Sequence, residues 1–108
     1  MNDPVQTQLD AYNARDINAF APCFTEDVEA YELHSNTLIF KGRSALIDRY
    51  APMFEESPNL HCRLLSRIIE GDTTIDHESV TGMRDNPEVR AIAIYHVTST
   101  GIDKIWFA

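Results

Sequence analysis

The chain has 108 residues, of which 44% are hydrophobic, and this suffices for one domain spanning residues 1–108 around one hydrophobic core. Its formal net charge of −8 repels phosphate backbones and anionic lipids, so nucleic-acid and membrane partners are not expected. No stretch approaches the roughly 18 uninterrupted apolar residues of a membrane helix. The N-terminus carries charge and proline where a signal peptide is apolar, so we expect a cytoplasmic protein.

Asp3 and Pro4 are typical of an N-cap followed by proline at the first helical position. Apolar residues then recur at helical spacing until near Arg15, which predicts a first amphipathic helix. Asp16 is expected to cap a second, short helix, and Pro22 should kink it because proline lacks a backbone donor. The two helices are therefore predicted to form a hairpin.

From residue 28 onward the pattern changes to strict alternation, which predicts a strand over 28–33. Residues 34–36 are typical of a turn, and a second short strand is expected over 37–40. Ser44 can cap a third helix with an apolar face, which Pro52 should bend or end early.

The second half of the chain is predicted to be almost entirely strand. The expected strands cover residues 60–69, 73–81, 89–98 and 102–107. Glycine turns and the Asn86-Pro87 loop separate them, and such short connections imply consecutive antiparallel strands. The strand over 89–98 is apolar on both faces, with Ile92 and Ile94 on one of them. We expect a second copy of the chain to cover that face in a homodimer.

This order of elements resembles that of nuclear transport factor 2-like proteins, which include the SnoaL-like and ketosteroid isomerase-like domains. Three segments carry the resemblance: LDAYNARDINAFAPCFTEDVEAYEL, FKGRSALIDRY and IYHVTSTGIDKIWF. They are similar to the family's helical hairpin, the start of its third helix and its closing strand hairpin. The resemblance implies an α+β fold in which a cone-shaped, curved antiparallel sheet wraps around helices of the N-terminal half. It also implies a pocket, but it specifies no reaction.

The resemblance to ketosteroid isomerases implies that Glu32 takes the position of the family's catalytic base. Those enzymes stabilise the developing oxyanion with a tyrosine and a protonated aspartic acid. Gln8 and Ala93 take these two positions here, so steroid isomerisation is not expected. Tyr12 lies one helical turn beyond Gln8 and could supply a displaced hydroxyl donor.

Asp76 and Glu78 flank a histidine, and strand alternation sends the two carboxylates to the same face. On the concave face they would crowd with Glu32, and repulsion and desolvation would raise at least one pKa toward neutrality. Such a group could act as a general acid or base. Alternatively, both carboxylates are solvated or pair with Arg63 or Arg67 on the neighbouring strand.

Candidate ligand-binding residues are the aromatic Tyr95 and Trp106 on late strands, together with Tyr12 and with His61 near the pocket rim. The four histidines match no metal-binding spacing, and the two cysteines are expected to be buried, reduced thiols. We therefore predict no metal site. The chain has no glycine-rich phosphate loop, so no nucleotide or other cofactor is expected.

Three functions remain open from the sequence. The first is a cofactor-free acid/base enzyme acting on a small apolar molecule, an isomerase, cyclase, dehydratase or hydrolase. In it, Glu32 would be the base, Asp76 or Glu78 the second carboxyl group, and Tyr12 or Tyr95 the hydroxyl donor. The second is a non-catalytic protein that binds a small apolar or amphipathic molecule. The third is a dimeric interaction module whose interior is filled.

Overall fold

The computed structural model describes residues 3–83 and 87–108, so Asn86 of the expected 86–87 loop lies outside the described residues. Helix α1 (Pro4–Ala14) begins at Asp3, whose carboxylate accepts hydrogen bonds from the backbone N–H groups of Val5 and Gln6. Helix α2 (Ile17–Phe20) is capped in the same way by Asp16 and continues into a 3₁₀ turn over Ala21–Cys23. The predicted N-caps Asp3 and Asp16 are therefore confirmed.

Strand β1 (Phe24–Glu32) begins four residues before the predicted strand, and β2 (Thr37–Lys41) follows the predicted turn. Helix α3 (Arg43–Glu56) has Gly42, not Ser44, at its N-cap position, and it continues through Pro52 instead of ending early. The last strands are β3 (His61–Glu70), β4 (Thr73–Thr81), β5 (Val89–Thr98) and β6 (Gly101–Phe107), each within one residue of the prediction.

The six strands form one sheet in the order β2-β1-β6-β5-β4-β3. Consecutive strands from β3 to β6 are antiparallel, as their short connections predict. The curved sheet is confirmed, and it is antiparallel as expected except that β1 and β6 pair in parallel. These two strands are joined by no turn: the chain passes through α3 and four further strands between them, which leaves their relative direction free.

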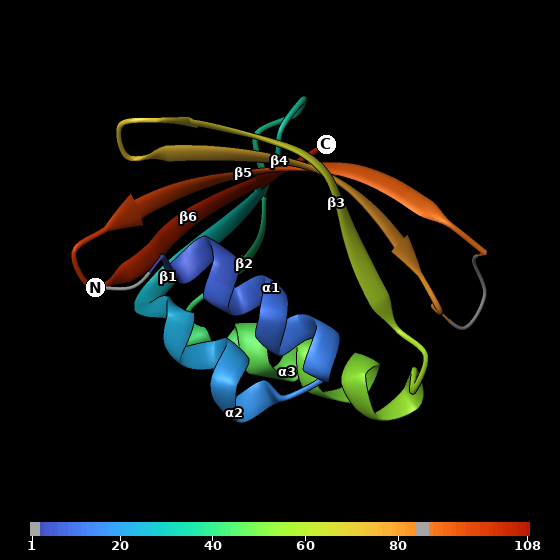
Figure 1. Cartoon of the computed structure of the whole chain (residues 1–108). Coiled ribbons are helices and arrows are strands. Elements are labelled where there is room, and N and C mark those ends of the chain that lie inside the picture. The colour runs from blue at the N-terminus through green and yellow to red at the C-terminus, as the bar shows by residue number, and fades with distance from the viewer. Residues whose placement is uncertain (1–2, 84–86) are drawn as a thin grey trace.

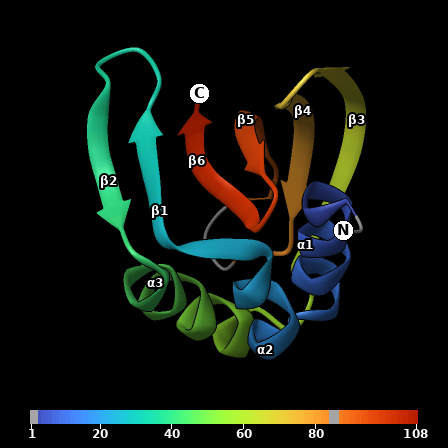
Figure 2. The ribbon, with the colours of Figure 1, turned by 90° about the vertical axis from the view of Figure 1, so that its left-hand side faces the viewer.

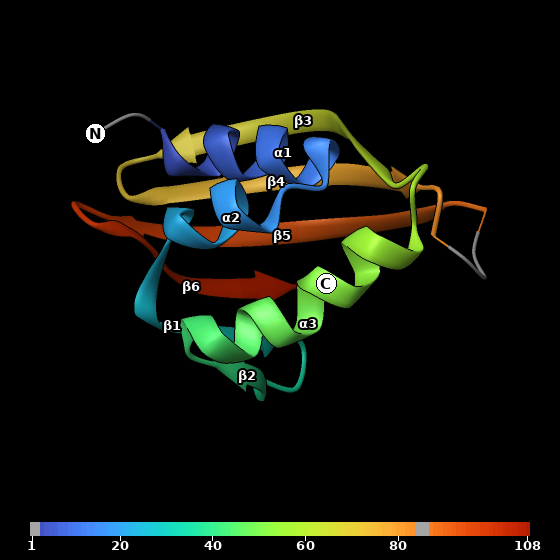
Figure 3. The ribbon, with the colours of Figure 1, turned by 90° about the horizontal axis from the view of Figure 1, so that it is seen from below.

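The sheet curls over the helices, which all lie on its concave side (Figure 1). In a second view the curved sheet forms a half-open cone, and the helices lie together at one end of it (Figure 2). From below, α1 runs along β3 and β4, whereas α3 packs against β1 and β2 (Figure 3). The hydrophobic core fills the space between these layers and includes Val5, Phe20, Leu46 and Ile105. No helix of the described residues is long and apolar enough to cross a membrane.

Candidate functional site

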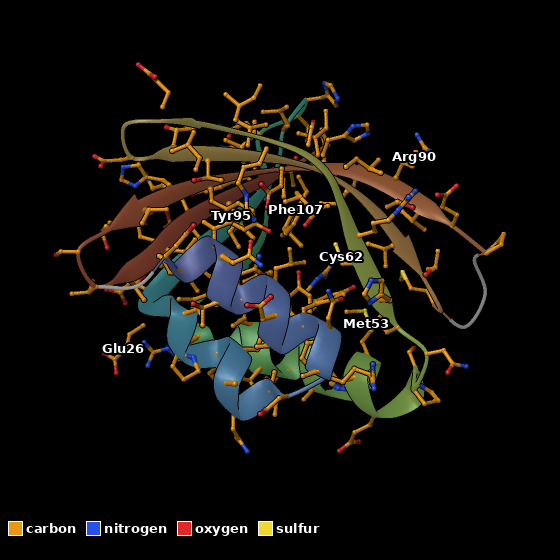
Figure 4. The ribbon with its side chains drawn as sticks, viewed as in Figure 1. Glu26, Met53, Cys62, Arg90, Tyr95 and Phe107 are labelled. Atoms are coloured by element: carbon orange, nitrogen blue, oxygen red, sulfur yellow. The ribbon has the colours of Figure 1, made fainter. Side chains whose placement is uncertain are left out.

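A cavity of about 540 Å³ lies between the helices and the concave face of the sheet, and its lining comes from all three helices and all six strands. Most of the lining side chains are apolar, as is usual for small-molecule pockets. Met53, Cys62, Tyr95 and Phe107 lie in this space, whereas Arg90 points away from it (Figure 4). The cavity also opens to solvent, because the exposed side chain of Arg49 on α3 is part of its lining.

Glu78 on β4 is the carboxylic acid of the cavity lining, and only 8% of the residue is exposed. Burial raises its pKa to about 7, because a charged carboxylate is costly where water is excluded. A hydrogen bond from Cys62 opposes this rise, the charge of Asp76 adds to it, and the charge of Arg67 opposes it again. Near neutral pH, Glu78 therefore exists in both protonation states, as a general acid or base requires.

The thiol of Cys62 on β3 donates to Oε2 of Glu78 over 3.3 Å. Burial is the main cause that raises the pKa of Cys62, and the nearby Glu78 adds to it, so the sulfur stays protonated and inert as a nucleophile. The other oxygen, Oε1, accepts no hydrogen bond from residues 3–83 or 87–108. One face of the carboxyl group is thus held by the protein, and the other is available to a ligand.

Three tyrosines surround this carboxyl group: Tyr12 from α1, Tyr50 from α3 and Tyr95 from β5. Burial raises the pKa of Tyr50 to about 12 and raises those of Tyr12 and Tyr95 further. The charge of Glu78 contributes to all three shifts. Each phenol therefore remains neutral and can donate a hydrogen bond. The hydroxyl of Tyr95 itself accepts from Nε2 of Gln8 over 3.3 Å.

Asp76 faces the same side of β4 as Glu78 and is completely buried, but it does not line the cavity. Arg67, its cross-strand partner on β3, donates to both carboxylate oxygens, over 2.6 Å from Nε and 2.9 Å from Nη2. The third donor of Arg67 binds Oε1 of Gln6 on α1 over 2.8 Å. Both carboxylate oxygens of Asp76 are thus held by Arg67, and Asp76 is not part of the cavity lining.

The expectation that Glu32 points into the cavity with a raised pKa is wrong. Glu32 is the last residue of β1, and its carboxylate turns back to accept hydrogen bonds from the backbone N–H and the hydroxyl of Ser35. Hydrogen bonds from the 33–36 turn lower its pKa, which is the opposite of the expected direction. Because its carboxylate is hydrogen-bonded to the turn, Glu32 is not part of the cavity lining.

Of the four predicted ligand-binding residues, Tyr12 and Tyr95 line the cavity, whereas His61 and Trp106 do not. His61 is exposed at the start of β3, where its neighbour Cys62 takes the inward position. The indole of Trp106 stacks on Tyr31 with ring centroids 6.1 Å apart, because Ile105 and Phe107 take the inner face of β6. Both corrections follow from strand parity, since adjacent residues face opposite sides.

The sequence predicts a buried thiol at Cys62 but indicates no site role for Cys62, Tyr50 or Arg49. Two sequence signals could have placed the first two residues in the cavity wall. Cys62 faces the side of its strand opposite to His61, and Tyr50 shares a helix face with Leu46 and Phe54. Arg49 directly precedes Tyr50 on α3, and its exposed side chain is part of the cavity lining. In the described part of the chain, no group of three or more His, Cys, Asp or Glu side chains is arranged to hold a metal ion.

Comparison with solved structures shows the same fold in bacterial proteins of low sequence identity. A cystatin-fold protein from Novosphingobium aromaticivorans is 18% identical, with a TM-score of 0.86 over 97% of this chain and 94% of the other. An NTF2-like protein of unknown function from Cytophaga hutchinsonii is 14% identical, with a TM-score of 0.81 over 98% of this chain and 86% of the other.

A third solved structure, a candidate SnoaL-like polyketide cyclase from Jannaschia sp., is 18% identical, with a TM-score of 0.77 over 97% of this chain and 81% of the other. No curated protein matches the sequence. The SnoaL-like domain, in contrast, matches residues 5–106, which include every element from α1 to β6 with only their outermost residues left out. The chain therefore belongs to the SnoaL-like domain family.

Proposed function

We propose that this protein binds a small, largely apolar or amphipathic molecule in its cavity and that Glu78 exchanges a proton with it. The observation that carries the proposal is a carboxyl group with a pKa near 7 in the wall of an apolar cavity of about 540 Å³. Perturbed carboxyl groups in such clefts are frequently catalytic. The activity would be cofactor-free acid/base catalysis of the isomerase or cyclase type.

In this proposal the ionised Glu78 removes a proton from a C–H or O–H group of the ligand, and the protonated form returns it. The neutral phenols of Tyr12 and Tyr50 donate hydrogen bonds to the oxygen on which negative charge develops. Loss of one such donor costs about 3–4 kcal/mol of transition-state stabilisation in well-studied sites. The carboxyl oxygen Oε1 faces the ligand while Cys62 holds Oε2.

The names of the structural neighbours are compatible with this chemistry, since they include candidate polyketide cyclases and a candidate ketosteroid isomerase. Steroid isomerisation itself is not proposed. Gln8 has its amide hydrogens directed to Tyr95 and to the carbonyl of Val5, and the methyl group of Ala93 offers no donor. The reaction would therefore rely on Glu78 and on the phenols of Tyr12 and Tyr50, which stand at other positions than the catalytic groups expected from ketosteroid isomerases.

The test combines NMR titration of side-chain carboxyl groups with a thermal-shift screen of small metabolites. Glu78 should titrate near pH 7, and a ligand found in the screen should be converted by the wild type but not by Glu78→Gln, which keeps the shape and loses the proton. Glu88→Gln is the matched control because Glu88 is exposed and lies immediately before β5. An ordinary pKa for Glu78, near 4.5, would contradict the proposal.

A second candidate function is non-catalytic binding of the same kind of molecule. It is favoured by the pairing of polar groups inside the cavity, where Gln8 already donates to Tyr95 and Cys62 to Glu78. Product analysis separates the two candidates, because a binding protein returns its ligand unchanged. A filled interior, as an interaction module would need, is not compatible with a cavity of this size.

We also propose that the outer face of the sheet pairs with a second copy of the chain. Ile92 and Ile68 lie on that face and are 40% and 63% exposed, and no helix of the described residues lies on that side (Figure 1). Covering such apolar area removes it from water. Light scattering at micromolar concentration should give about twice the chain mass of 12.3 kDa, and Ile92→Asp should lower it. A wild-type monomer throughout this range would contradict the pairing.

A further inference from the structure

Two residues of the cavity lining carry ionisable groups of opposite sign, the guanidinium of Arg49 and the carboxyl group of Glu78. Their different exposure indicates how a charged ligand would be oriented in the cavity. Arg49 is exposed and lines the opening, whereas Glu78 is 8% exposed and lies inside. Tyr50, the next residue after Arg49 on α3, also lines the cavity, and its pKa responds to the charges of both Arg49 and Glu78. The cavity therefore presents an exposed cation, a neutral phenol and a buried carboxyl group.

The guanidinium of Arg49 has no carboxylate partner in the described part of the chain. It lies over the ring of Phe40, with 5.9 Å between Cζ and the ring centroid. Stacking on an aromatic ring holds the planar group in place and leaves its N–H donors for other acceptors. Other cations are engaged differently: Arg67 binds Asp76, and Arg43 donates to the carbonyl of Phe24.

The charge of Arg49 matters in a chain whose formal net charge is −8. The overall field of this protein repels anions, so a cation at the cavity opening gives a local reversal of sign. A guanidinium also matches the planar, bidentate geometry of a carboxylate, which a neutral head group cannot use as well. An anionic end that reached Glu78 would instead meet a carboxyl group that ionises near pH 7.

We propose that the ligand is an amphipathic monocarboxylate, bound with its carboxylate at Arg49 and its apolar body in the cavity. This orientation places the far part of the molecule beside Glu78, where the proposed proton transfer takes place. The inference rests on the proposed function and adds to it the ligand's head group and its direction of binding. Tyr50 adds a neutral hydrogen-bond donor next to the guanidinium.

The test compares two probes of equal length, 6-phenylhexanoate and 6-phenylhexan-1-ol, by isothermal titration calorimetry with the full chain. Wild type should bind the carboxylate about tenfold more tightly than the alcohol, as expected for one charge-assisted pair. Arg49→Gln should remove this preference and leave the alcohol affinity unchanged, which shows that the cavity is intact. Arg49→Lys should keep part of the preference, because it keeps the charge but loses the fork of donors.

Arg90→Gln is the matched control, since Arg90 is exposed but points away from the cavity (Figure 4). It should keep the full preference for the carboxylate. Equal affinity of wild type for both probes, or an equal loss in Arg90→Gln, overturns the assignment to Arg49 while alcohol binding preserves the proposed function. Failure of wild type to bind either probe counts against both the assignment and the proposed function.

Discussion

Asp76 and Glu78 are the same kind of group, on the same strand and the same face, yet the structure uses them differently. Asp76 is completely buried and receives two hydrogen bonds from Arg67. Glu78, two residues further along β4, has only the weak thiol donor of Cys62 and a free oxygen toward the cavity. The partner, more than the burial, decides whether a carboxyl group is fixed as a charge or left able to exchange a proton.

The comparison extends to the elements that supply the partners. Opposite Asp76, β3 offers a guanidinium that also reaches Gln6 on α1, so the pair is part of the packing between sheet and helix. Near Glu78, β3 offers only the thiol of Cys62, and the space between the sheet and the helices is the cavity. One half of the concave face is therefore closed by a polar network, and the other half is open for a ligand.

The largest expected effect comes from removing the cation of the closed half. Arg67→Met leaves Asp76 buried without a partner and should lower the free energy of unfolding by about 3–5 kcal/mol, measured by urea denaturation. Arg90→Gln, which breaks only an exposed pair with Glu88, should cause little change. Asp76→Leu added to Arg67→Met should recover much of the loss, and a mild effect of Arg67→Met alone would contradict this account.

The next effect concerns Glu78 and the pH dependence of stability. Its pKa is about 7 in the folded protein and 4.5 in the reference state, so between these values the folded state binds more protons. Its contribution to stability is therefore fully present below about pH 4.5 and is lost as pH rises through 7, by on the order of 3 kcal/mol. Glu78→Gln should lack this loss, so the variant should gain on wild type with rising pH. Parallel stability curves would contradict it.

A smaller effect is expected from the thiol that holds Glu78. Cys62→Ala removes a hydrogen bond that lowers the pKa of Glu78, so this pKa should rise above its wild-type value of about 7. Cys62→Ser, with a stronger hydroxyl donor, should keep it near or below that value. Cys23→Ala is the control, because the other buried cysteine donates to a backbone carbonyl of α2. NMR of labelled glutamate measures all three, and equal titration curves would remove Cys62 from the site.

The parts of this site that the sequence predicted are those that depend on local period. Strand alternation predicted that Asp76 and Glu78 share one face, which in the structure is the concave one, and helical spacing from Gln8 indicated that Tyr12 could reach the cavity that it lines. The choice between Arg63 and Arg67 as a partner stayed open, because it depends on register. In the sheet, a shift between Leu64 and Ser66 puts Arg67 opposite Asp76. A bulge of this kind leaves no clear trace in one sequence.

Parity explains why two predicted residues lie outside the cavity. On β6 the run Ile105-Trp106-Phe107 is apolar at every position, so period alone does not tell which residues face inward. The pairing of β6 with β1 and β5 decides it and leaves Trp106 stacked on Tyr31. His61 was misplaced for the same reason, since the inward position belongs to its neighbour Cys62.

The smallest effect is expected at Glu32, which the family resemblance had placed at the base position. Glu32→Gln should leave ligand affinity, its pH dependence and the pKa of Glu78 unchanged, because the Glu32 carboxylate binds Ser35 in the turn beyond β1. Ser35→Ala is the matched variant, since it removes one of the donors that lower the pKa of Glu32 and should raise that pKa without affecting the cavity. Calorimetry at pH 6 and pH 8 with the same ligand measures both variants. A change in the pH dependence of binding for Glu32→Gln would mean that this carboxylate reaches the ligand. Glu32 on β1 would then be a second proton-exchanging carboxyl group beside Glu78 on β4.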